Sequence, residues 1–84
     1  MTLKLLYFAR LRETLGVSRE SLMLEAPATV AALLEHLRAR GGVWATELAT
    51  GRNFRIAVNQ EMADLNTPLS EGDEVAVFPP VTGG

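Results

Sequence analysis

The chain has 84 residues, 48% of them hydrophobic, which is enough for one small domain with its own apolar core. It contains no cysteine, which excludes disulfides, thiolate metal sites and a cysteine nucleophile, and which fits a reducing, cytoplasmic location. The formal net charge is −2, basic residues are scattered and no apolar run could span a membrane, so we expect a protein partner, with no nucleic acid and no membrane.

The first part of the sequence predicts two strands joined by a short helical segment. Residues 2–8 alternate with apolar side chains on both faces, which is typical of a central strand. Residues 9–15 place two leucines four positions apart before Gly16, which predicts one or two helical turns that end at this glycine. Residues 21–26 predict a second strand, and Pro27 ends it.

The main helix is predicted to begin after Thr29, which is a good N-cap residue. Apolar residues then follow at the i, i+3, i+4 and i+7 positions of an amphipathic helix, and they are Val30, Leu33, Leu34 and Leu37. Arg38 and Arg40 are expected in its last turn, where positive charge interacts favourably with the helix dipole.

The second half of the chain predicts mainly strands. Residues 43–49 are ambiguous, but two apolar anchors four positions apart favour a short helical turn against the core. Residues 54–58 alternate as a third strand, and residues 61–64 are expected to form a short edge strand. Residues 68–73 read as a turn cluster before a last strand at residues 74–78.

This order of elements predicts an α+β domain at residues 1–78, in which a mixed sheet of about five strands packs on one main helix, the β-grasp arrangement. The first and last strands then lie side by side, so Leu6 and Phe8 are expected next to Ala76 and Phe78, on the face away from the helix. An exposed apolar patch of this kind usually marks a protein interface. The alternative is that the two phenylalanines fill a second, minor core.

The chain ends in an extended tail at residues 79–84. Pro79 and Pro80 fix φ and lack backbone N–H donors, so the tail is expected to leave the sheet as a stiff stalk. Gly83 and Gly84 have no Cβ and therefore suit a narrow channel in a partner enzyme. The terminal carboxyl, with a pKa of about 3.3 to 3.7, is ionised near neutrality and can attack the α-phosphate of ATP to form an acyl-adenylate. The alternative is an ordinary frayed chain end.

The sequence contains no residue pattern typical of a metal site, a catalytic triad or a phosphate-binding loop. His36 is the only histidine and lies on the polar side of the helix pattern, so a surface role is expected and no metal site or catalytic triad can be completed. The glutamates, Glu20 among them, are spread along positions expected to face solvent. No glycine motif precedes a helix in the way that a phosphate-binding loop requires, so the chain is not expected to bind ATP alone.

The segment from Gly72 to Gly84, GDEVAVFPPVTGG, resembles the closing signature of the small subunit of molybdopterin synthase, the MoaD family of ubiquitin-like sulfur carriers. The resemblance covers nearly the whole chain. Supporting matches are found after the first strand, at the start of the main helix, after that helix and at the turn before the edge strand; they are residues 8–13, Thr29–Val30, Trp44 and residues 58–60.

The resemblance implies a carrier rather than an enzyme in its own right. Gly84 would be adenylated by a ubiquitin-activating-type adenylyltransferase that uses ATP and Mg, and a sulfur donor enzyme would supply the sulfur for a C-terminal thiocarboxylate. The tail would enter a large catalytic subunit within a heterotetramer. The sulfur would then pass to cyclic pyranopterin monophosphate (precursor Z) to form the dithiolene of molybdopterin in molybdenum cofactor biosynthesis. No cofactor or metal bound by this chain itself is implied.

The resemblance also assigns residue roles. Gly84 would bear the sulfur, and the residues threaded into the partner would be Pro79, Pro80, Val81, Thr82 and Gly83. Phe8 and Phe78 would contact partners, and Arg12 matches a family arginine that touches the activating enzyme. Two alternatives stay open: a sulfur carrier for thiamin thiazole, cysteine or tRNA thiolation, and a protein modifier. Lys4 is the only lysine, which disfavours chains of the protein's own kind.

Overall fold

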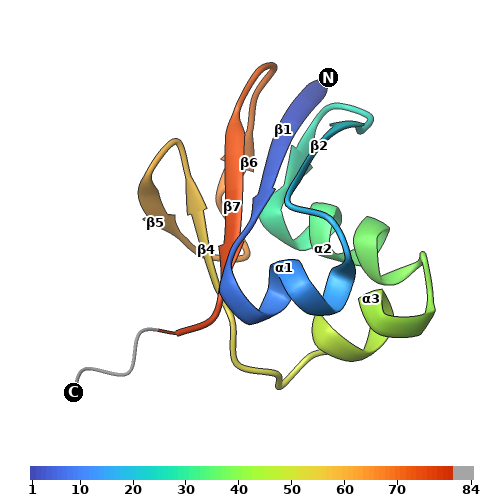
Figure 1. Cartoon of the computed structure of the whole chain (residues 1–84). Coiled ribbons are helices and arrows are strands. Elements are labelled where there is room, and N and C mark those ends of the chain that lie inside the picture. Colours follow the sequence, from blue (N-terminus) through green and yellow to red (C-terminus); the bar gives the residue numbers. More distant parts are fainter. Residues whose placement is uncertain (81–84) are drawn as a thin grey trace.

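The computed structural model describes residues 1–80, and residues 81–84 lie outside the described part. The elements of this part are arranged as in Figure 1. In chain order they are β1 (Thr2–Tyr7), α1 (Ala9–Leu15), β2 (Arg19–Met23), β3 (Ala28–Thr29), α2 (Val30–Arg38), α3 (Gly42–Glu47), β4 (Arg55–Val58), β5 (Glu61–Ala63), β6 (Pro68–Leu69) and β7 (Glu74–Phe78).

The main sheet has five strands in the order β2-β1-β7-β4-β5. The first and last strands, β1 and β7, are parallel neighbours at its centre, and the other pairs are antiparallel. Figure 1 shows α2 behind this sheet. The predicted α+β class, with a mixed sheet on one main helix, is therefore confirmed.

One apolar core lies between the sheet and α2. The period-two alternation of β1 buries Leu3, Leu5 and Tyr7 almost completely. They pack with inward-facing residues of β7 and with the apolar side of α2, where the buried residues are Val30, Leu33, Leu34 and Leu37. Burial of each such leucine or valine contributes about 1.5 to 3 kcal/mol, which makes this contact the main stabilising element of the domain.

The helix boundaries follow from capping chemistry. The backbone N–H of Ala32 donates to Thr29 Oγ1 over 3.4 Å, as expected for an N-cap threonine. Gly16 adopts φ 77° and donates its N–H to the Arg12 carbonyl, which ends α1 where the sequence predicted. The ambiguous residues 43–49 include most of α3, which begins one residue earlier, at Gly42, and ends at Glu47. In residues 1–80 no helix is long and apolar enough to cross a membrane.

Two parts of the fold differ from the prediction. The second strand is β2, Arg19–Met23, rather than residues 21–26, because its register is set by pairing with β1, from Thr2 opposite Met23 to Leu6 opposite Arg19. The turn cluster at residues 68–73 begins with β6, which pairs with β3 in a separate two-stranded ladder. Strands of two residues carry no periodic pattern, so this ladder has no signal in the sequence.

Candidate functional site: the end of β7 and the outer face of the sheet

The last strand, β7, lies at the centre of the sheet, and Pro79 and Pro80 follow it. β7 is held on one side by β1 and on the other by β4, where Arg55 lies opposite Phe78. The N–H of Phe8 donates to the Val77 carbonyl over 3.1 Å, which adds a hydrogen bond at the end of the β1–β7 ladder. Pro79 and Pro80 follow and are half-buried. The remaining predicted tail residues, which are Val81, Thr82, Gly83 and Gly84, lie outside the described residues.

The face of the sheet away from α2, here called the outer face, is defined by the residues that alternate with the buried ones. Its apolar members are Leu6, Phe8, Met23, Ala57, Met62, Ala76 and Phe78, and its polar and charged members are Thr2, Lys4, Arg19, Ser21, Arg55 and Glu74. Residues directly opposite each other in a ladder share a face, so the register establishes the strand members of this set. Phe8 follows β1 with an extended backbone and is assigned by continuing the alternation of that strand.

An apolar row crosses four strands of the outer face. Leu6 of β1 lies opposite Ala76 of β7, Ala76 opposite Ala57 of β4, and Ala57 opposite Met62 of β5. Phe8 and Phe78 lie beyond this row, toward the chain exit. Phe8 is 44% exposed and Met62 is 64% exposed. The predicted apolar patch beside the tail is therefore present, and neither phenylalanine belongs to the buried core.

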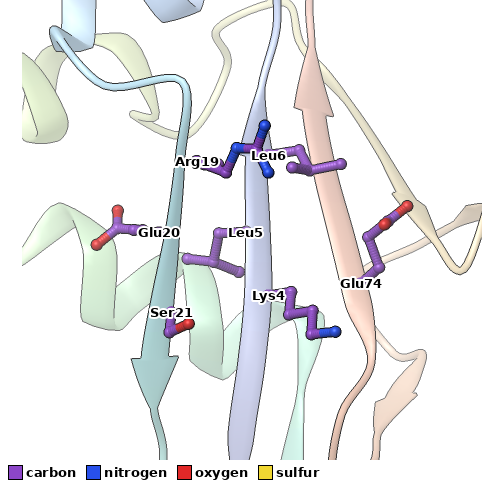
Figure 2. A pocket seen from close by; sticks show the side chains of 7 residues that line it. All are labelled: Lys4, Leu5, Leu6, Arg19, Glu20, Ser21 and Glu74. Atoms are coloured by element: carbon purple, nitrogen blue, oxygen red, sulfur yellow. The ribbon is translucent and has the colours of Figure 1, made fainter.

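A hollow of about 410 Å³ lies in the outer face over β2, β1 and β7. In Figure 2, Leu6 lies between Arg19 and Glu74, and Lys4 lies two residues before Leu6 on β1. The side chains of Lys4 and Glu74 come from opposed positions of β1 and β7, but they diverge in this view. The hollow therefore has an apolar centre and charged side chains around it, among them Glu20 of β2, whose carboxylate is paired with Arg40.

Arg12 lies on α1 near this surface. Its N–H donates to the Phe8 carbonyl, so it sits one helical turn from that exposed phenylalanine. Its side chain is exposed and forms no ion pair within residues 1–80. The fold thus places Phe8 and Phe78 near the end of β7, and Arg12 on the helical turn that follows Phe8.

Sequence reasoning missed a polar network at the other side of β1. The Tyr7 hydroxyl donates to Glu20 Oε2 over 2.7 Å, and Arg40 donates to both Glu20 oxygens over 2.9 Å. The Arg40 guanidinium lies 4.4 Å from the centre of the Trp44 ring, which makes an edge contact with Tyr7 at 5.4 Å.

This network corrects two expectations. Glu20 does not simply face solvent, and Arg40 is not in the last turn of α2, which ends at Arg38. The hydrogen bonds from Arg40 lower the pKa of Glu20, and burial together with the Glu20 contact raises the pKa of Tyr7. Because the partners are 13 and 20 residues apart, no local pattern could have revealed their contact. The network joins β1 and β2 to the segment after α2.

Metal chemistry has no support in the described part of the chain. No group of three or more histidine, cysteine, aspartate or glutamate residues there could hold a metal ion. His36 is exposed on α2, on the opposite side of the sheet from the outer face.

The fold and the sequence define a class. The mixed sheet on one main helix is a ubiquitin-like β-grasp fold, and residues 5–84 match the ThiS family model; the chain belongs to the ThiS family. SAMP1 from Haloferax volcanii is similar in structure, with a TM-score of 0.84 and 28% identity over 100% of both chains. A putative molybdopterin converting factor subunit 1 from Pyrococcus furiosus has a TM-score of 0.83 and 31% identity, covering 96% of this chain and 99% of its own.

Within this class the chain is similar to molybdopterin synthase sulfur carrier subunits. It is 44% identical to that of Escherichia coli and 43% identical to that of Haemophilus influenzae, each over 98% of this chain and 99% of the relative. It is also 35% identical to small archaeal modifier protein 3 of Haloferax volcanii over 100% of both chains. In structure it resembles a chain in the complex of subunits 1 and 2 of molybdopterin-converting factor from Helicobacter pylori, with a TM-score of 0.71 and 26% identity over 100% of both chains. The predicted family resemblance is confirmed.

Proposed function

We propose that this protein is the sulfur carrier subunit of a molybdopterin synthase. The observation that carries the proposal is the 44% identity to the Escherichia coli sulfur carrier subunit over nearly the full length of both chains. The segment from Gly72 to Gly84, which resembles the closing signature of this carrier family, supports the same function.

The proposed chemistry takes place at Gly84. The terminal carboxylate attacks the α-phosphate of ATP in an activating enzyme, which forms an acyl-adenylate and releases pyrophosphate. Sulfur at the sulfide level (HS⁻), supplied by a donor enzyme, then attacks the acyl carbon and displaces AMP, which leaves a thiocarboxylate. Nucleophilic attack of this sulfur on a carbon of cyclic pyranopterin monophosphate forms a C–S bond as a C–O bond at that carbon breaks and the oxygen leaves. Water then hydrolyses the thioester between carrier and product, which leaves the sulfur on the product and restores the carboxylate of the carrier. Each dithiolene needs two such transfers.

The proposed partner for sulfur transfer is a large catalytic subunit, in a heterotetramer with two carriers. The complex of subunits 1 and 2 from Helicobacter pylori supports a partner of this kind. The outer face would provide the contact through Phe8 and Phe78, and Pro79 and Pro80 would direct Val81, Thr82, Gly83 and Gly84 into the partner's active site. We assign Arg12 to contact with the activating enzyme.

The chain would have no catalytic activity alone. We propose that ATP and Mg are used by the activating enzyme and that this chain itself binds no cofactor. The cysteine-free composition supports a cytoplasmic site of action, since it fits a reducing compartment.

The proposal is tested by supplying the carrier with sulfur and mixing it with its large subunit and the pyranopterin precursor. We expect conversion of the precursor into molybdopterin in proportion to the thiocarboxylate supplied. Unloaded carrier is the matched control and should give no product. A loaded carrier that gives no product with its large subunit, but restores a thiolated tRNA, a thiazole or cysteine, would contradict the proposal and favour another sulfur pathway.

The second candidate function is protein modification, and the 35% identity to small archaeal modifier protein 3 favours it. The same adenylate would then be attacked by a lysine amine of another protein rather than by sulfur. Detection of this chain in isopeptide linkage to other proteins would support the modifier function. Sulfur transfer without such conjugates would leave the carrier function alone.

A further inference from the structure

The charges of the molecule are distributed unevenly between the outer face and the rest of the chain. The outer face carries three cations, Lys4, Arg19 and Arg55, and one carboxylate, Glu74, which gives a formal charge of +2. Because the whole chain carries −2, the remaining residues together carry −4. An acidic protein therefore presents a basic surface around its apolar row.

The cations of the outer face differ from most of the other basic residues in their contacts. Arg10, Arg40 and Arg52 each pair with a glutamate, at 2.6, 2.9 and 3.1 Å. Within residues 1–80 no carboxylate lies in ion-pair distance of Lys4, Arg19 or Arg55. These three side chains are all exposed. Their charge is thus available to a partner.

These cations lie beside two apolar parts of the outer face, the hollow around Leu6 and the side chain of Phe78. Arg19 lies directly opposite Leu6, and Lys4 is two residues before Leu6 on the same strand, so both border the hollow shown in Figure 2. Arg55 lies directly opposite Phe78 at the exit of the chain. Glu74 is opposite Lys4 without forming an ion pair in the described residues.

We propose that the outer face binds an acidic surface of the large catalytic subunit, with Lys4, Arg19 and Arg55 as the residues that steer association and select this partner. The apolar row supplies contact area, and the three cations around it provide long-range attraction and fix orientation. Charge at the rim of an interface acts mainly on the association rate and its salt dependence. This inference rests on the proposed function, because that function supplies the partner.

The test measures association and dissociation rate constants of the carrier with its large subunit at about 50 mM and about 500 mM salt. Arg19→Gln is compared with His36→Glu. Both substitutions lower the formal net charge of the chain by one, but His36→Glu places the change on the exposed side of α2. Since opposite charges accelerate encounter, we expect Arg19→Gln to slow association at low salt on the order of threefold, and the difference to vanish at high salt. His36→Glu should stay near the wild-type rate, and Glu74→Lys should associate faster. Melting temperatures should be unchanged, so that folding does not account for the result.

The outcomes separate the two proposals. If the wild-type carrier does not bind the large subunit at all, the proposed function is wrong and this inference falls with it. If the wild type binds but its association is independent of salt, or if Arg19→Gln and His36→Glu behave alike, the steering role is wrong and the proposed function stands. An outer face that steers only the activating enzyme would likewise contradict the assignment to the large subunit.

Discussion

The two faces of the five-stranded sheet are built from adjacent residues but have opposite properties. Leu5 and Val77 point toward α2 and are completely buried, while Leu6 and Phe78, their neighbours in sequence, lie on the outer face and keep part of their surface in water. The apolar side chains of the inner face pack against α2 in one buried cluster. The outer face leaves apolar area and positive charge without partners in the described part of the chain.

Alternate residues of the same strands therefore have different roles: those on the inner face stabilise the fold, and those on the outer face are available for binding. A change on the inner face should alter the free energy of unfolding, and a change on the outer face should alter binding. A change at Gly84, where we propose the reaction, should alter chemistry.

Deletion of Gly84, or addition of one residue after it, should abolish sulfur transfer while the melting temperature is unchanged. The reason is that the reacting carboxyl would be lost or displaced, whereas the buried core of the described residues is formed by side chains between Leu3 and Val77. Molybdopterin formation and thermal unfolding measure the two effects. An extra residue before Thr2 is the control for a general effect of chain length, and sulfur transfer by either Gly84 variant would contradict the thiocarboxylate mechanism.

Leu5→Ala and Leu6→Ala form a matched pair on the two faces of β1. Leu5→Ala removes a completely buried side chain and should reduce the free energy of unfolding by about 2 to 5 kcal/mol. Leu6→Ala should cost less than about 1 kcal/mol in stability, because its site is already partly open to solvent, and should instead weaken binding to the large subunit. Denaturant titration and binding measurements check the pair. Equal losses of stability would show that the outer face is part of the core.

Phe78→Ala tests the apolar contact beside the chain exit. We expect binding to the large subunit to weaken by about 1 to 4 kcal/mol, since a half-buried aromatic side chain at an interface centre is a typical hot spot. Val77→Ala, on the inner face, is the control and should lower stability more than affinity. A sharp fall in the melting temperature of Phe78→Ala with unchanged affinity would place Phe78 in the core instead.

Glu20→Gln tests the polar network of Tyr7, Glu20, Arg40 and Trp44. Because Arg40 lowers the pKa of Glu20 in the folded state, this carboxylate stabilises the fold above its ordinary pKa, and the contribution is lost as pH falls through the lowered pKa. The variant should lose about 1 to 2 kcal/mol at neutral pH and less in acid. The raised pKa of Tyr7 affects stability in the alkaline range. Because the folded state keeps this hydroxyl protonated, the free energy of unfolding should fall as pH rises above about 10, where tyrosine ionises in the unfolded chain.

Urea titrations of Glu20→Gln and the wild type across the acid range give the measurement. The two curves should converge as pH falls. A difference that is the same at every pH would show that the ion pair contributes no linked stability, and that the loss arises from packing alone.

Arg52→Ala should have the smallest effect. Its ion pair with Glu47 spans 3.1 Å at the surface, and the arginine side chain is 49% exposed, so the expected loss of stability is below about 0.5 kcal/mol. Thermal unfolding checks this value. A larger loss would indicate that Glu47, which also pairs with Arg10, organises α1 and α3 more tightly than surface pairs usually do.

Much of the fold could be predicted because its signals are local. The alternation of residues 2–8 and 74–78, the Thr29 cap and the stop at Gly16 each depend on neighbouring residues. The adjacency of β1 and β7 followed from the order of elements. The exact bounds of β2 and the β3–β6 ladder could not be predicted, because strand pairing over long sequence distances decides them.

The candidate site divides in the same way. The apolar patch of Leu6, Phe8, Ala76 and Phe78 was predicted because strand alternation assigns side chains to faces. The pairing of Glu20 with Arg40 was missed, since it depends on how the segment after α2 returns to the sheet. The roles of Pro79 and Pro80 stay predictions, as do those of residues 81–84, which lie outside the described residues.

The most direct test of the central claim is the intact mass of the carrier after incubation with its activating enzyme, ATP, Mg and a sulfur source. The account predicts a mass gain equal to the replacement of one oxygen by sulfur, and no gain when Gly84 is deleted. An unchanged mass with the cognate activating enzyme, together with conjugates of this chain on lysines of other proteins, would contradict the sulfur carrier function and establish the modifier function in its place.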